Sequence, residues 1–206
     1  MAAVHLVVNK PAGVTSTVRD RHALRTVLDL VPRALLPDGG RLYPVGRLDL
    51  DSEGLLILTN DGAWSERVVH PRFGVEREYA IGLPAPLAVE QIRSLEAGID
   101  LDEGRAELFH LRQATAPETA RLAGLLEPPP AGLAWYRATL RQGRKRQLRR
   151  MFGAVGAPIA RLVRVRIGPV RLERLRSGEI RPLSLAEVRA LASGARGAGR
   201  YPHRDG

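Results

Sequence analysis

The 206-residue sequence contains no cysteine, and no apolar run approaches the roughly 20 residues that a helix needs to cross a bilayer. The absence of cysteine excludes disulfides, thiolate zinc sites and cysteine nucleophiles. The short apolar stretch at residues 4–9 is followed at once by Lys10 and Pro11, so it predicts a strand rather than a signal peptide. We therefore expect a cytoplasmic protein without membrane contact.

Lysine is scarce, because only Lys10 and Lys145 occur among the 32 basic residues. A high-GC genome accounts for most of this preference for arginine, but it does not explain where the arginines lie. Residues 141–176 hold 12 basic residues and a single acid, Glu173, so this segment carries the whole formal net charge of +10. A basic field of this density usually meets a polyanion such as nucleic acid.

Apolar residues make up 44% of the chain, which is enough for a sizeable core. Hydrophobic spacing and turn residues predict strands at residues 4–9, 42–45, 55–59, 78–82, 106–113, 136–142 and 159–167, and helices at 63–69, 87–97 and 147–155. Because strands and helices do not alternate regularly, we expect an α+β fold with a mixed, mostly antiparallel central sheet and flanking helices. The strand at 159–167 alternates apolar residues with arginines, which predicts one solvated, cationic face.

Four acidic residues lie close together in YPVGRLDLDSEGLLILTNDG, residues 43–62: Asp49, Asp51, Glu53 and Asp61. Asp49 and Asp51 form a DxD pattern that could hold Mg²⁺, but no histidine or further acidic cluster supplies the remaining ligands. Asp49 and Glu53 could act as a general acid–base pair, although nothing in the sequence fixes their separation. The simplest interpretation is that Asp51, Ser52 and Glu53 shape a turn and that Asp61 caps the following helix.

Arg47 and Asp49 differ from the other residues of this stretch because they lie beside a strand end, where a side chain can project rigidly into a cleft. A lone, buried nucleophilic Asp49 needs a cationic partner to stay ionised. The arginines between residues 144 and 150 are the candidates.

The stretches VVNKPAGVTS, YPVGRLDLDSEGLLILTNDG, HPRFGVEREYA, RQGRKRQLRRMFGAVGAPIARLVRVRIGPVRLERL and SGEIRPL follow one another in the sequence. In their order and spacing they resemble the motifs of the RsuA/RluB/RluE/RluF family of rRNA pseudouridine synthases, from about Val4 to Glu187. The resemblance implies a mostly antiparallel sheet with a central RNA-binding cleft. It also implies an isomerase that needs no cofactor and no metal.

The same resemblance implies the site residues. The nucleophilic aspartate of GRLD falls on Asp49, the tyrosine of the K/R-x-Y motif on Tyr79, and the basic residue of QxRRM on Arg149, which we expect to pair with Asp49. Arg150 is the alternative partner; on a helix the two arginines point about 100° apart. Arg47 resembles an arginine that occupies the gap left by a flipped nucleotide, and Lys10 belongs to the KPxG motif below the catalytic loop. The RNA-binding residues are expected to be Arg47, Lys10, Arg144, Lys145, Arg146 and Arg150.

Many members of this family carry an S4-type RNA-binding domain before the NKPxG strand, whereas this chain starts a few residues before it. We expect a catalytic domain at residues 1–190 without an S4 domain, and a disordered basic tail at 191–206. The expected partner is rRNA, as a folded stem-loop or within a pre-ribosomal particle, and the expected state is a monomer. Large-subunit rRNA is the favoured target. Small-subunit rRNA, tRNA, a mainly RNA-binding assembly factor and a metal-dependent nuclease stay open as alternatives.

Overall fold

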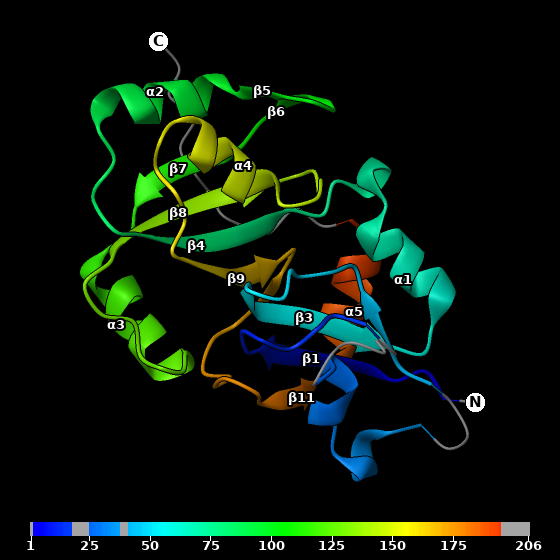
Figure 1. Ribbon diagram of the computed structural model, residues 1–206. Helices are drawn as coiled ribbons and strands as arrows, with labels where there is room; N and C mark the ends of the chain where they lie inside the picture. Colours follow the sequence, from blue (N-terminus) through cyan, green and yellow to red (C-terminus); the bar gives the residue numbers. More distant parts are fainter. Residues whose placement is uncertain (1, 18–24, 38–40, 195–206) are drawn as a thin grey trace.

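A nine-stranded sheet organises the computed structural model, which describes residues 2–17, 25–37 and 41–194 (Figure 1). The main strand order is β11-β1-β3-β9-β4-β8-β7, β10 pairs with β9, and β2 pairs with β3. The strands are β1 (His5–Lys10), β2 (Tyr43–Val45), β3 (Glu53–Thr59), β4 (Arg77–Leu83), β7 (Phe109–Gln113), β8 (Ala134–Leu140), β9 (Arg161–Ile167), β10 (Val170–Arg171) and β11 (Ile180–Pro182). Within the described ranges, β3 and β9 form the one parallel pair of strands.

Helices cover both faces of the sheet, so the α+β prediction is confirmed (Figure 1). The helices are α1 (Gly62–Val69), α2 (Val89–Ala97), α3 (Ala116–Leu125), α4 (Gln147–Ala154) and α5 (Leu185–Ala192), and there are three short 3₁₀ turns, at Val27–Leu30, Arg33–Leu35 and Pro71–Phe73. Apolar residues of α2 and α4 belong to one hydrophobic cluster, whereas those of α1, α3 and α5 belong to a second. A two-stranded hairpin, β5 (Ile99–Leu101) and β6 (Gly104–Ala106), stands apart from the sheet.

Residues of β3 alternate between the two clusters, because successive side chains of a strand point to opposite faces. Leu56 and Leu58 pack into the first cluster and Leu55 and Ile57 into the second, all fully buried. This explains why LLIL reads as a continuous apolar run. The helix that follows begins as predicted, since Asp61 accepts a 3.0 Å hydrogen bond from the backbone N–H of Trp64.

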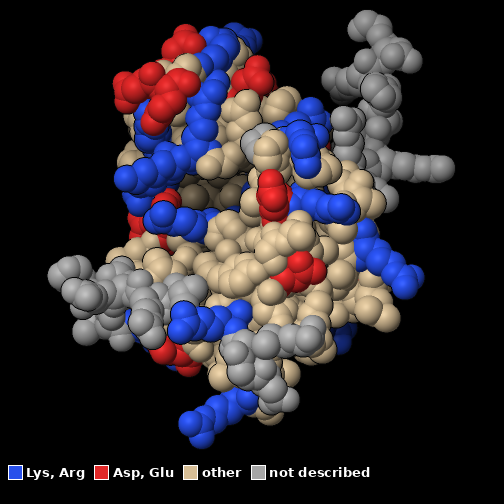
Figure 2. Space-filling model, turned by 90° about the vertical axis from the view of Figure 1, so that its right-hand side faces the viewer, with Lys and Arg blue, Asp and Glu red and all other residues tan. Residues whose placement is uncertain are grey.

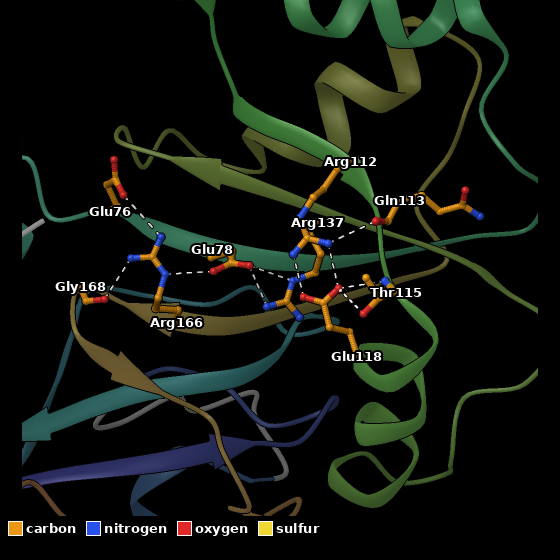
Figure 3. Close-up of polar contacts among 9 residues, drawn as sticks. All are labelled: Glu76, Glu78, Arg112, Gln113, Thr115, Glu118, Arg137, Arg166 and Gly168. Atoms are coloured by element: carbon orange, nitrogen blue, oxygen red, sulfur yellow. Dashed lines mark hydrogen bonds and ion pairs between the residues drawn. The ribbon is translucent and has the colours of Figure 1, made fainter. Parts of the chain in front are cut away.

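The prediction of a solvated cationic face on β9 is wrong. β9 lies between β3 and β4, and Arg164 and Arg166 are only 3% and 7% exposed. Arg166 donates to Glu78 and Glu76, and Glu78 also accepts two bonds from Arg137 of β8 (Figure 3). Arg164 and Arg166 can be buried because a carbonyl or carboxylates of neighbouring strands accept their hydrogen bonds, which single-strand periodicity cannot reveal.

Several boundaries differ from the predicted ones. The strand predicted at 106–113 is split between β6 and β7, and α3, α5, β5, β10 and β11 were not predicted. The predicted domain boundary after residue 190 falls inside α5, where Leu191 is fully buried, so residues 191 and 192 belong to the folded domain. Residues 195–206 of the predicted tail lie outside the described residues. Every helix in the described ranges is too short or too polar to span a membrane.

Candidate active site

The loop between β2 and β3, residues 46–52, presents Asp49 from the middle of the sheet. The buried hydroxyl of Ser16 holds it on one side, donating to the carbonyl of Leu48 (2.8 Å) and accepting from the backbone N–H of Leu48 (3.1 Å). The backbone N–H of Gly13 donates to the carbonyl of Leu50 at 2.8 Å. The residues on both sides of Asp49 are therefore fixed, and its carboxylate, 31% exposed, projects from a rigid backbone.

Asp49 and Tyr79 line one cavity of about 540 Å³. Tyr79 comes from β4 and is 8% exposed, so its ring forms part of a packed wall. The rest of the wall combines apolar and basic side chains, and Figure 2 shows a hollow in the surface with lysine and arginine side chains at its edge. The basic residues that line the cavity are Arg47, Arg77, Arg141, Arg144, Lys145, Arg146 and Arg164.

The charged contact of Asp49 is with Arg146, whose Nη1 lies 3.8 Å from Oδ2 of Asp49. Arg146 also reaches both carboxylate oxygens of Asp51 at 3.2 Å. Arg149 instead places Nε 3.4 Å from Asp51 Oδ2 and donates to the carbonyls of Asp51 and Ile159. The predicted Arg149–Asp49 ion pair is therefore wrong for this structure. Arg149 points its side chain across the loop to Asp51 rather than to Asp49.

Asp51 and Glu53 are more than turn residues. Burial would raise the pKa of Asp51, but hydrogen bonds from Arg146 and the nearby Arg149 charge outweigh it and lower that pKa. Glu53 begins β3, and its buried carboxylate accepts two bonds from Arg161 at 2.7 and 2.9 Å. The prediction that Glu53 only shapes a turn is wrong, because it pairs with an arginine 108 residues away.

Two of the predicted RNA-binding arginines are engaged by the β5–β6 hairpin. Arg150 forms ion pairs with Asp102 (2.9 Å) and Glu103 (2.6 Å), both exposed. Arg144 donates to the carbonyl of Gly104 in the same hairpin. Any RNA phosphate that binds Arg150 must compete with these carboxylates, whereas Lys145 and Arg47 are exposed at the cavity.

Lys10 is fully buried, so the prediction that it contacts RNA is wrong. Its Nζ donates to the carbonyls of Pro11 and Val14, both at 2.8 Å, and approaches the carbonyl of Leu50 at 3.5 Å. Burial lowers the pKa of Lys10 to about 8, and the charges of Glu53 and Asp51 oppose that shift only in part. Lys10 thus supports the loop from below.

Sequence reasoning missed four residues around Asp49: Ser16, Ser52, Arg77 and Arg164. Ser52 and Arg164 are buried residues of the cavity wall, and each carries a buried polar atom without a hydrogen-bond partner among the described residues. Arg77 precedes Tyr79 by two residues and so lies on the same face of β4. That spacing is visible in the sequence and could have indicated Arg77. The other three positions depend on long-range contacts.

The carboxylates of the DxD pattern face arginines rather than further oxygen ligands. Within the described part of the chain, no group of three or more His, Cys, Asp or Glu side chains gathers as a metal site would require. The arrangement suits a different chemistry: the cations around the cavity can bind an anionic polymer, an aromatic ring can stack on a group inserted from it, and the carboxylate in the same cavity can attack that group.

Comparison with known proteins places this geometry in context. The model of the family described as RNA pseudouridylate synthase matches residues 4–154. Over 91% of this chain, the ribosomal large subunit pseudouridine synthase B of Bacillus subtilis is 35% identical, and the chain spans 71% of that protein. The protein of the same name from Pseudomonas aeruginosa is 34% identical over 91% of the chain, which spans 45% of its length. A crystal structure of a pseudouridylate synthase superposes with a TM-score of 0.73 at 28% identity, covering 92% of this chain and 74% of the other.

Proposed function

The chain belongs to the RNA pseudouridylate synthase family, and on that premise we propose that it isomerises one specific uridine of large-subunit (23S) rRNA to pseudouridine. The observation that carries the proposal is that Asp49 and Tyr79 line one cavity whose edge is basic. The names of the curated relatives, which refer to the large ribosomal subunit, support rRNA as the substrate.

Uridine in a folded RNA must leave its stack before a side chain can reach it, at a cost of a few kcal/mol. Lys145, Arg47 and Arg146 stand at the cavity, where contacts with the flanking phosphates offset part of this cost. Stacking on Tyr79 offsets more, since every base offers a π-face to an aromatic ring. The extruded base then occupies the cavity beside Asp49.

Asp49 acts as the nucleophile that attacks the target nucleotide, at ribose C1′ or at C6 of the base, and the bond between C1′ and N1 breaks. Nucleophilic catalysis divides the isomerisation into steps with lower barriers. The detached uracil turns, and its C5 forms the new bond to C1′. Tyr79 lies against the base and assists removal of the C5 proton. Arg146, or Arg149 after a side-chain movement, keeps Asp49 charged and oriented.

The rRNA substrate implies a cytoplasmic site of action, on a stem-loop that is free or part of a pre-ribosomal particle. We also propose that the protein acts as a monomer. The basic cavity edge and the exposed residues around it contribute to recognition of the target stem-loop.

The test is an Asp49→Asn variant assayed on the rRNA of the source organism, with Asp51→Asn as a matched control from the same loop. We expect Asp49→Asn to bind RNA with near-native affinity and to form no pseudouridine, whereas Asp51→Asn, which weakens the contacts to Arg146 and Arg149 but keeps the nucleophile, retains part of the activity. Retention of pseudouridine formation by Asp49→Asn would refute the proposed role. Pseudouridine mapping of rRNA with and without the gene identifies the modified position, and a change in small-subunit rRNA or tRNA instead would correct the target.

A second function, ribosome assembly through RNA binding, is favoured by the basic cavity edge alone. It predicts that Asp49→Asn fully rescues the ribosome defect of a deletion strain. Failure of that rescue by a folded, RNA-binding variant argues for the enzymatic function.

A further inference from the structure

Two arginines of the cavity wall, the partly buried Arg77 and the buried Arg164, lack a carboxylate partner among the described residues. Arg164 is 3% exposed; its Nε donates to the carbonyl of Leu55 (2.7 Å) and its Nη1 to the carbonyl of Arg47 (3.3 Å). Arg77 makes only long bonds, to the carbonyls of Val75 (3.3 Å) and Val68 (3.4 Å). The other arginines of β9, Arg161 and Arg166, both form ion pairs.

The third nitrogen of Arg164, Nη2, is buried and has no hydrogen-bond partner among the described residues. The Oγ of Ser52, which also lines the cavity, is likewise buried without a hydrogen-bond partner among the described residues. A buried guanidinium with an unused donor is costly unless a ligand supplies the missing acceptor. The unpaired atoms therefore indicate a polar, electron-rich group that enters the cavity.

Strand register brings these charges next to Tyr79. Tyr79 of β4 pairs directly with Arg164 of β9, and a register shift lies between Glu78 and Tyr79. Because of that shift, Arg164 and Arg166 pair with adjacent residues of β4, whose side chains point to opposite faces. Arg166 thus joins the Glu78 ion pairs of Figure 3, while Arg164 lines the cavity with Tyr79. Burial, and next the charge of Arg164, lower the pKa of Arg77, which is the sign of two like charges held together.

The depth of the two arginines decides which part of an RNA they meet. Backbone phosphates stay at the surface and fit the exposed cations at the cavity edge, whereas an extruded base enters furthest. When the C1′–N1 bond breaks, its electron pair goes to N1, and the uracil carries one negative charge spread over N1, O2 and O4. On the route through C1′, Asp49 meanwhile forms a bond to C1′. When C5 then bonds to C1′, the bond between Asp49 and C1′ breaks and the carboxylate is regenerated, the C5 proton leaves, and N1 takes up a proton.

We propose that Arg77 and Arg164 form a cationic floor that binds the uracil as it leaves C1′ as an anion. This inference rests on the proposed function and adds to it a role for two residues that do not contact Asp49 in the structure. Preorganised donors aimed at a developing negative charge, in a site that excludes water, stabilise a transition state strongly. The floor also keeps the detached base inside the cavity while it turns.

The experiment compares two RNAs, one with uridine and one with 5-fluorouridine at the target position. Fluorine makes the base more acidic and so a better leaving group, which needs less help from the arginines. The Arg77→Gln variant is used at a concentration that saturates the RNA. We expect its single-turnover rate of C1′–N1 cleavage on uridine RNA to be about a hundredfold below that of the wild type. On 5-fluorouridine RNA we expect a fall of only about tenfold. Cleavage is read from the loss of the original nucleoside after complete digestion.

Arg141→Gln is the matched control, since it removes a guanidinium from the same cavity at a position 42% exposed. It should change both rates by one common factor. Arg164→Lys is the second test variant, because it keeps the positive charge but loses the planar guanidinium with its several donors. Thermal melting checks that each variant folds. Equal losses on the two RNAs for both test variants would overturn the proposal, as would a loss confined to affinity and its salt dependence. If wild-type protein forms no pseudouridine at all, it is the proposed function that fails.

Discussion

Nη1 of Arg146 lies 3.8 Å from Oδ2 of Asp49, and Arg146 itself has a left-handed backbone (φ 51°) at the start of α4. This conformation is unfavourable for a residue with a side chain, and such strain tends to persist where the surrounding structure needs it. It turns the Arg146 guanidinium toward the loop of Asp49. The next turn of α4 carries Arg149, which lies closer to the core.

Arg146→Gln and Arg149→Gln should therefore differ. The Arg146 side chain is 43% exposed, so its loss should change stability by less than about 1 kcal/mol. Loss of its charge beside Asp49 should slow pseudouridine formation about tenfold, which is about 1.4 kcal/mol of activation free energy.

Arg149 is 12% exposed and donates to two carbonyls, so its loss should also reduce stability, by about 1–3 kcal/mol. Thermal melting and single-turnover rates measure both effects. Unchanged melting with loss of activity for Arg149→Gln alone would show that Arg149 moves to Asp49 when RNA binds.

RNA affinity should depend on salt, and the dependence should distinguish Lys145 from Arg150. Each phosphate contact contributes about 0.9 to the slope of log affinity against log salt for duplexes and about 0.7 for single strands. Lys145→Gln should lower the slope by about this amount. Arg150→Gln should lower it less, because Asp102 and Glu103 already hold that guanidinium. RNA-binding titrations at several salt concentrations measure the two slopes. Equal slopes for the two variants would contradict the expected difference between Lys145 and Arg150. Replacing Asp102 with Asn and Glu103 with Gln together should strengthen binding, since Arg150 is then released.

Stability should rise with pH on account of Lys10. Its pKa is about 8 in the folded protein and 10.5 as a free side chain, so the unfolded chain binds the extra proton between these values. The stabilisation linked to this depressed pKa is fully present above pH 10.5 and is lost as the pH falls through about 8. Over this window we expect the free energy of unfolding of wild-type protein to rise by an amount on the order of 3 kcal/mol relative to Lys10→Met. Denaturant unfolding at several pH values measures it.

The informative quantity for Lys10→Met is the slope of its unfolding free energy against pH rather than its absolute stability. Methionine also leaves the carbonyls of Pro11 and Val14 without their donor, which lowers stability at every pH. Parallel pH curves for the two proteins would show that Lys10 stays charged in the fold.

The fold and the location of Asp49 could be read from the sequence because they depend on local patterns. The LLIL run and the Asp61 cap each occupy a few consecutive residues, and the apolar alternation of β8 needs no partner to be recognised. The split between β6 and β7, by contrast, falls at two residues, Glu107 and Leu108, whose polarity does not mark a break.

The partners of the arginines could not be read from the sequence, because each depends on residues far along the chain. Glu53 pairs with Arg161 only once β3 and β9 are adjacent, and Glu78 pairs with Arg137 and Arg166 only once β4 lies between β8 and β9. A basic segment predicts a polyanion partner, yet some arginines of that segment are buried in the fold and form ion pairs there. The register shift at Tyr79 then decides which arginine lines the cavity, and no periodicity in one strand encodes it.

Gly54 lies where β3 and β9, the parallel pair, approach each other closely. Its φ is +100°, and a Cβ added there would collide with the backbone of Arg164, including its nitrogen at 2.7 Å. Gly54→Ala should therefore be destabilised by on the order of 3 kcal/mol or more, since neither backbone can shift without breaking the strand pairing that carries Arg164. Activity should fall even in protein that remains folded, because Asp49 and Arg164 are displaced relative to each other.

Gly124→Ala is the control for the effect of the methyl group itself. Gly124 lies in α3, and a Cβ added there would meet no atom within 4 Å, so alanine should stabilise the protein by about 1 kcal/mol through helix propensity. Chemical denaturation of both variants gives the two free energies. If Gly54→Ala lowers the free energy of unfolding by no more than about 1 kcal/mol, the ordinary range of point substitutions, the backbones of β3 and β9 can move apart at little cost. In that case the geometry between Asp49 and Arg164 would not be fixed by this close approach.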